Sequence, residues 1–381
     1  MCTWKSKLVA GSRRNNMSLK NPIFTTCILL IAISAVHAQD SAVFDASKNA
    51  WKLYYQDPET SQWTQKIYVQ QNAISPTIQS TVQNIQNQFS YRYRITNRHD
   101  AKQLIDTFRI WGIPIIYPTP NLPRVTASAR NDSEVEDKQQ WALLLANRQF
   151  EKKVILAPKG WSATLRTDES ANQSSFVWTP GLKDTDPDGI APGRSQDGFT
   201  VMRTELPGMA RAKLTGSTEE PWGLDNLPDT PFWRAQVKLI QEQDYVLVPV
   251  MTPVIPVPTP YNAAVLARSL REHVQTWLKY GHIDTNTLAR INRQFDVLIP
   301  ALDIGHRKSA VAAIEALIKE CVNHHSDLLN HPVETDDDHH AATPIRKTTT
   351  PASATPPPVF DRTAARALIF NLRYIRMKLE L

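Results

Sequence analysis

The chain has no apolar run that clearly suits a membrane span. The run from Ile23 to Val36 is too short to cross a bilayer comfortably. Lys20 precedes it, and Val36-His37-Ala38 follows it as a small-residue cleavage pattern. Translation starts at Met1 or Met17, and residues 1–38 are predicted to be a signal peptide. We therefore expect export to the periplasm, the extracellular space or the cell surface. A single N-terminal anchor helix is the alternative.

Cysteine is almost absent. The chain has three cysteines, Cys2, Cys27 and Cys321, and the first two lie in the predicted signal peptide. A single remaining cysteine cannot form an intramolecular disulfide. The fold must therefore rely on a hydrophobic core, and the remaining length is ample for one large or two ordinary domains.

A large excess of one charge is also missing once the signal peptide is removed. The whole chain carries 43 Lys and Arg against 37 Asp and Glu, a net charge of +6. Residues 1–38 contain five of these basic residues and no acidic one, so the remainder carries 38 minus 37, or +1. This balance argues against nucleic-acid binding.

Familiar catalytic motifs are lacking as well. The sequence contains no G-x-S-x-G, no H-E-x-x-H and no phosphate-binding loop. His99 is the only histidine between residues 39 and 256, and it lies in a polar turn where we expect it to be exposed to solvent. No catalytic residue is therefore assigned. A glycosidase with two carboxylates stays open, because such a pair needs no fixed spacing.

The stretch from Phe89 to Ile110 is the clearest strand signal. Phe89, Tyr91, Tyr93 and Ile95 alternate with polar residues, which is the period of a strand with one buried face. The following run, residues 103–110, is predicted to return beside it as a hairpin. Residues 72–88 read as a long connection or an edge strand.

Other short strands are predicted on both sides of this stretch. They cover residues 51–55, 63–70, 154–157, 161–166 and 176–178, and a last edge strand begins at Val246. Turn dipeptides such as Pro180-Gly181 and Pro192-Gly193 separate apolar pieces. This spacing favours an antiparallel β-sandwich, immunoglobulin-like or jelly-roll-like, over residues 39–256. The stretch from Pro192 to Gly208 resembles closing strands of secreted bacterial sandwich domains of unassigned role.

The pattern changes to helical after a proline-rich linker at residues 257–262. Asn262 and Asp284 are good N-caps for two amphipathic helices, the second of which is expected to stop at Pro300. A third helix follows Gly305, and a last helix covers residues 361–381. Residues 331–358 are predicted to be a disordered insert, because they contain few apolar side chains. The sequence thus predicts a small antiparallel helical bundle over residues 263–381.

This C-terminal part resembles the FIMAH domain, a small helical module found near the ends of secreted bacterial proteins. The similarity rests on Tyr280-Gly281-His282-Ile283, the helix from Leu288 to Leu298, Gly305 before an Ala-rich helix, and a terminal Ala-x-x-Leu-Ile helix. It covers most of residues 263–379, and the long insert departs from the family. The resemblance implies an exported, multi-domain context and no catalytic residues.

Asp184, Asp186 and Asp188 form the D-x-D-x-D-G opening of a calcium loop with Gly189. The twelfth position is Ser195, not the bidentate Glu that completes such a loop. These three aspartates are the metal candidates, and a solvated turn is the alternative interpretation. We expect no tight calcium binding and no other cofactor.

Two further groups of residues are candidate binding sites. Several His and Asp residues between His324 and His340 could ligate a transition metal, although their spacing is not that of a rigid site. Eight tryptophans between residues 39 and 256 suggest either core packing or a surface on which sugar rings stack.

Taken together, these patterns predict an exported, non-catalytic interaction or scaffolding protein with a protein or cell-surface partner. The alternative is a carbohydrate-binding or carbohydrate-active protein that uses surface tryptophans and acidic residues. The two differ in whether a concave surface gathers exposed tryptophan with two or more carboxylates.

Overall fold

The computed structural model describes residues 39–85, 88–114, 153–168, 170, 173–181, 189–218, 224, 227–329 and 360–381. Predictions for the signal peptide 1–38, the three metal-candidate aspartates and the insert 331–358 lie outside these residues. Within the described part, no helix combines the length and apolar character that a membrane span needs.

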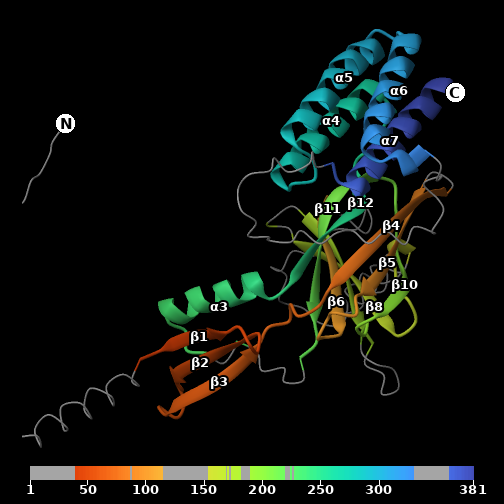
Figure 1. Cartoon of the computed structure of the whole chain (residues 1–381). Coiled ribbons are helices and arrows are strands. Elements are labelled where there is room, and N and C mark those ends of the chain that lie inside the picture. Colours follow the sequence, from red (N-terminus) through yellow and green to blue (C-terminus); the bar gives the residue numbers. More distant parts are fainter. Residues whose placement is uncertain are drawn as a thin grey trace, which may run out of the picture. The chain divides into compact units, whose positions relative to one another are not determined.

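The strands form three antiparallel sheets, followed by helices in the C-terminal part of the chain (Figure 1). The first sheet has the order β1 (Ser41–Asp45), β2 (Ala50–Gln56), β3 (Trp63–Val69). The second has the order β4 (Pro76–Ile85), β5 (Gln88–Asn97), β10 (Arg194–Arg203), β7 (Ile155–Leu156). The third has the order β12 (Val246–Ile255), β11 (Leu206–Gly216), β6 (Ile105–Pro114), β9 (Gln173–Pro180), β8 (Trp161–Asp168).

The contacts divide the chain into two compact units. The first contains the described residues up to Val69 and those between Trp222 and Val237, and the second contains the described residues of the remainder. The boundary predicted at residues 257–262 thus falls inside the second unit.

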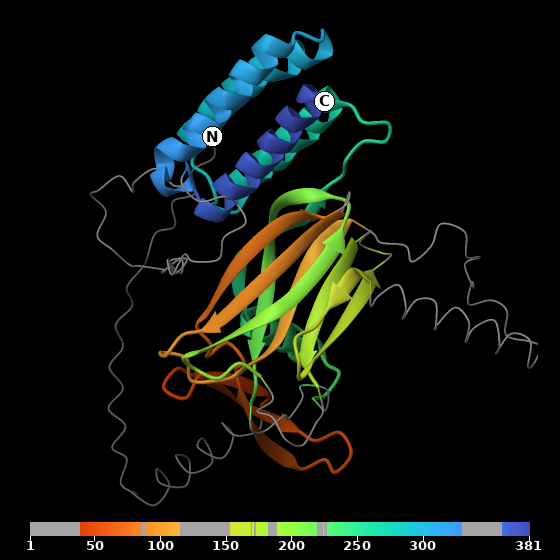
Figure 2. The ribbon, with the colours of Figure 1, turned by 90° about the vertical axis from the view of Figure 1, so that its right-hand side faces the viewer.

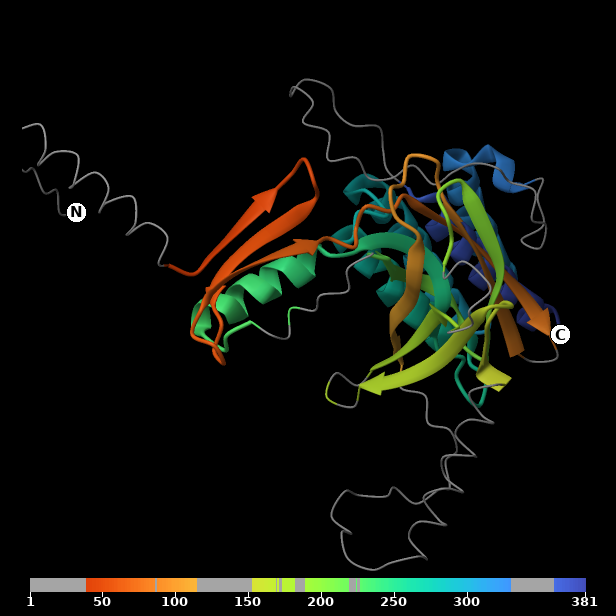
Figure 3. The same ribbon diagram turned by 90° about the horizontal axis from the view of Figure 1, so that it is seen from below.

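The first unit consists of β1–β3 and the beginning of α3 (Pro231–Gln243) (Figure 3). The ring of Trp233 in α3 lies 5.9 Å from that of Tyr55, and both side chains are buried. The expectation that residues 51–70 join the sheets formed by the later strands was therefore wrong, because α3 covers their apolar face instead. Sequence reasoning also missed α3, although Pro231 at its first position is a usual start signal.

In the second unit, the predicted hairpin between residues 89–97 and 103–110 was wrong. β5 pairs with β4 and β10, whereas β6 belongs to the third sheet. The buried Asn97 fixes this crossover, because its Nδ2 donates to the carbonyl oxygens of Gln103 (2.8 Å) and Ile190 (2.9 Å). The edge-strand interpretation is confirmed for β4 and β12, which lie at the edges of their sheets.

The second and third sheets share one hydrophobic core. Phe108 of β6 stacks on Trp178 of β9 with ring centroids 4.7 Å apart. Tyr93 of β5 lies 5.7 Å from Phe108, and Phe199 of β10 lies 5.9 Å from Trp178. Aromatic rings from both sheets therefore meet edge to face in the interior.

Four longer helices follow, with a short 3-10 helix η2 (Ser326–Leu329) among them. They are α4 (Ala263–Lys279), α5 (Thr285–Asp303), α6 (Arg307–His324) and α7 (Arg362–Glu380) (Figure 2). The predicted caps are confirmed: the side chain of Asn262 accepts from Val265 N, and that of Asp284 accepts from Thr287 N. Gly281 follows α4 with φ of +73°, as expected for a C-terminal glycine.

Pro300 does not stop α5, contrary to expectation. The proline lies in the last turn, and the helix continues to Asp303. Only its own N–H is missing there, and its carbonyl oxygen still accepts from Ile304 N at 3.1 Å. The last turn is therefore completed around the proline.

The helices also pack on the third sheet. α7 contacts α4 and α6, and it also contacts β11. The apolar face of α7 is buried, and it includes Ala365, Leu368, Leu372 and Ile375. These residues belong to the same core as the two sheets.

Candidate functional site

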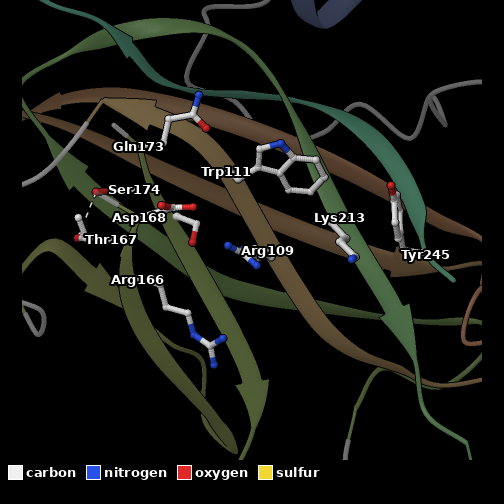
Figure 4. A pocket seen from close by; sticks show the side chains of 10 residues that line it. Arg109, Trp111, Arg166, Thr167, Asp168, Gln173, Ser174, Lys213 and Tyr245 are labelled. Carbon is white, nitrogen blue, oxygen red and sulfur yellow. Dashed lines mark hydrogen bonds between the residues drawn. The ribbon is translucent and has the colours of Figure 1, made fainter. Parts of the chain in front are cut away.

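A hollow of about 460 Å³ lies on the third sheet, and we refer to it as the third-sheet hollow. β6, β8, β9 and β11 supply its walls, together with Tyr245 just before β12 (Figure 4). Three cationic side chains line it: Arg109, Arg166 and Lys213. The hollow is therefore dominated by positive charge.

Strand alternation explains why two of these cations face the hollow. Phe108 and Ile110 are buried in the core, so Arg109 between them points to the opposite face of β6. Ala212 and Leu214 place Lys213 in the same way on β11. Arg109 and Lys213 are direct register partners, so two positive charges lie on adjacent strands of one face.

Strand alternation also puts Trp111 on this face, two residues after Arg109, and a β-bulge follows it in β6. Ile110 pairs with Phe176 and Ile113 pairs with Ser174, so β6 has one more residue than β9 between these pairs. The extra residue returns Ile113 to the core after the half-buried Trp111, which lines the hollow. Gly112 adopts φ of +77° at the bulge, a conformation that favours glycine.

The surroundings of Lys213 disfavour its charge. Burial lowers the pKa of Lys213, and the neighbouring positive charge of Arg109 lowers it further. The Lys213 ammonium lies 4.0 Å from the ring centroid of Tyr245, a contact that partly offsets this. The buried Nε of Arg109 has no hydrogen-bond partner among the described residues.

Asp168 is the one carboxylate among the described residues that line the hollow. It accepts a hydrogen bond from the hydroxyl of Ser170 at 2.6 Å. Hydrolysis by an acid pair requires two carboxylates at a suitable separation. The described lining of the hollow does not contain such a pair. With three cations and one carboxylate, the described lining suits binding of an anion.

A second hollow of about 340 Å³ lies beside α7 and contains Glu205, Tyr374 and Lys378. The carboxylate of Glu205 already forms an ion pair with Arg203, with Nε at 2.8 Å. The ring of Tyr374 packs against Phe89 at 5.7 Å. Glu205 and Tyr374 thus already have partners within the protein, so this hollow is the weaker candidate.

Some of the histidines singled out from the sequence lie among the described residues. His99 is exposed, as predicted. His324 lies within hydrogen-bond reach of Arg290, at 3.0 Å. The described residues contain no group of three or more His, Cys, Asp or Glu arranged to hold a metal ion.

The tryptophans divide between core and surface. Trp51, Trp178 and Trp233 are buried, whereas Trp63 is 47% exposed and Trp111 lines the hollow. Sequence reasoning missed the third-sheet hollow, because its cations come from strands far apart in the chain. The alternation Arg109-x-Trp111 within a strand was the available signal.

Neither a family model nor a curated protein matches this chain. Its function must therefore be inferred from the side chains themselves.

Proposed function

We propose that this chain is an exported, non-catalytic interaction protein that binds an anionic partner in the third-sheet hollow. The observation that carries this proposal is the register pair of Arg109 and Lys213 within the hollow. Like charges directly opposite each other on neighbouring strands destabilise a sheet. A bound anion would remove that repulsion.

The surroundings of this pair support the same conclusion. Asp244 favours the charged form of Lys213, but it ranks below burial and Arg109 among the influences on the lysine pKa. Arg166 adds a third positive charge to the hollow. An anion bound here would form charge-assisted hydrogen bonds, which are roughly twice as strong as neutral ones.

The architecture that we propose is an immunoglobulin-like or jelly-roll-like β-sandwich followed by an antiparallel helical bundle of the FIMAH type. The shared core of the second and third sheets supports the first part, and the capped helices α4, α5 and α7 support the second. The predicted signal peptide supports export to the periplasm, the extracellular space or the cell surface.

The carbohydrate alternative is favoured in its binding form by the presence of Trp111 in the hollow. Its hydrolytic form has less support, because Asp168 is the sole carboxylate of the described lining. The interaction protein and the carbohydrate-binding protein thus both have a binding role.

The test is binding of the chain from Gln39 onward to polyanions, measured by biolayer interferometry. The probes are polygalacturonate and poly-L-glutamate. We expect both to bind and the double variant Arg109→Gln/Lys213→Gln to weaken binding at least about tenfold. Arg94→Gln is the matched control, because Arg94 is 44% exposed on β5 of the second sheet. No binding of either polyanion, or equal binding by the double variant, would overturn the proposal.

A further inference from the structure

We infer that the anionic partner is an acidic polysaccharide, whose sugar ring stacks on Trp111 while its carboxylate or sulfate lies between Arg109 and Lys213. This inference rests on the proposed function and names its ligand class.

The first step is the placement of Trp111. Trp111 follows Arg109 by two positions in β6, so alternation places its indole, a side chain common in cores, in a polar hollow beside that cation. Flat aromatic faces bind sugar rings through their apolar C–H surfaces. An indole beside cations therefore suits a ligand with both a ring and a negative charge.

The second step is the polar lining that accompanies the indole. Gln173 and Ser175 of β9 and Thr167 of β8 line the hollow. Their amide and hydroxyl groups can both donate and accept hydrogen bonds. Sugar hydroxyls have the same dual character, so these groups match a glycan surface.

The third step distinguishes a glycan from an acidic peptide. An extended peptide commonly binds by adding a strand to a free sheet edge. β6 and β9 are interior strands of the third sheet, paired on both sides. The backbone of these strands is therefore already hydrogen-bonded, and a ligand over them is recognised by side chains. The edge strand β8 contributes to the lining, but Trp111, Arg109 and Lys213 lie on interior strands.

The fourth step concerns the anion itself. The buried Nε of Arg109 lacks a hydrogen-bond partner among the described residues, and Lys213 is its neighbour across the strands. Carboxylate and sulfate oxygens accept from such donors. Either group on a sugar would thus satisfy the same position.

The experiment compares polygalacturonate, dextran sulfate, neutral dextran and poly-L-glutamate as probes for the chain from Gln39 onward. Trp111→Ala is the test variant, Trp111→Phe restores a ring, and Trp63→Ala removes an exposed tryptophan of the first unit. We expect Trp111→Ala to weaken binding of the acidic polysaccharides about tenfold. Trp111→Phe should retain most of that affinity, and Trp63→Ala should bind like the unmodified chain.

The probes distinguish the contribution of charge to binding from that of the Trp111 ring. Weaker polysaccharide binding by Trp111→Ala, with unchanged poly-L-glutamate binding and no binding of neutral dextran, supports the inference. If Trp111→Ala weakens poly-L-glutamate binding as much as polysaccharide binding, or weakens binding of neither acidic polysaccharide, the inference is overturned. The proposed anion binding would still stand. Failure of all three polyanions to bind overturns both the inference and the proposed function. A preference between polygalacturonate and dextran sulfate tells whether carboxylate or sulfate is the favoured group, and either supports the inference.

Discussion

The backbone N–H of Met209 donates a hydrogen bond to Nε2 of His273, 2.8 Å away, and so joins β11 to α4. The imidazole can accept this bond only while Nε2 carries no proton. The preceding Gly208 provides the space, because a Cβ there would lie 2.3 Å from the same nitrogen. We therefore expect the packing of the helices on the third sheet to depend on pH.

Stability should fall between about pH 6.5 and pH 4. Burial, and secondly the neighbouring His282, lower the pKa of His273 from 6.5 to about 4. In this window the unfolded chain therefore binds a proton that the folded chain does not, and acidification favours unfolding. From pH 7.5 to pH 5 the loss in unfolding free energy should be about 2 kcal/mol. Urea titrations at the two pH values measure it.

The variant His273→Gln should lose most of that pH dependence, because its amide does not titrate. Burial also lowers the pKa of His282, so a smaller dependence of the same sign should remain. His306→Gln, at an exposed histidine, is the control and should titrate like the unmodified chain. An unchanged difference between pH 7.5 and pH 5 in His273→Gln would contradict this account.

A chain that ends at Pro358 should be less stable by several kcal/mol, because it lacks α7. Burial of each large aliphatic side chain contributes about 1.5–3 kcal/mol, and Leu368, Leu372 and Ile375 are fully buried. Their removal would expose core residues such as Leu266 and Leu317. Deletion of residues 331–355 should leave stability nearly unchanged, since loop length affects closure entropy only slowly. Thermal melting of both variants tests this. If the chain that ends at Pro358 had the same melting midpoint as the complete chain, the docking of α7 would be refuted.

Asn371→Ala should destabilise the second unit by about 1–3 kcal/mol. The Nδ2 of this buried residue donates to the carbonyl oxygen of Pro207 at 2.6 Å, and the substitution leaves that acceptor without its donor. Asn323→Ala, at an exposed position of α6, should change stability by no more than about 0.5 kcal/mol. Similar urea midpoints for the two variants would show that the bond from α7 to β11 contributes little.

Calcium should not bind with micromolar affinity at the loop that begins with Asp184. The twelfth position offers the hydroxyl of Ser195, which is hydrogen-bonded to that of Thr96 at 2.7 Å. The loop therefore lacks the bidentate carboxylate that such sites use. Calorimetry should detect no tight binding, and a micromolar affinity that disappears in Asp184→Ala would prove this wrong.

Features that depend on neighbours along the chain could be predicted from the sequence. The alternation from Phe89 to Ile95 gave β5, and the caps Asn262 and Asp284 gave the starts of α4 and α5. These signals are local, because strand alternation and helix capping involve residues at most a few positions apart.

Strand pairing was decided only by the tertiary structure. Periodicity shows which residues of a strand share a face, but it does not show which other strand lies beside it. The sequence therefore placed β6 next to β5, whereas core packing placed it between β9 and β11. That pairing sets Arg109 opposite Lys213, more than a hundred positions away in the chain, and so forms the hollow.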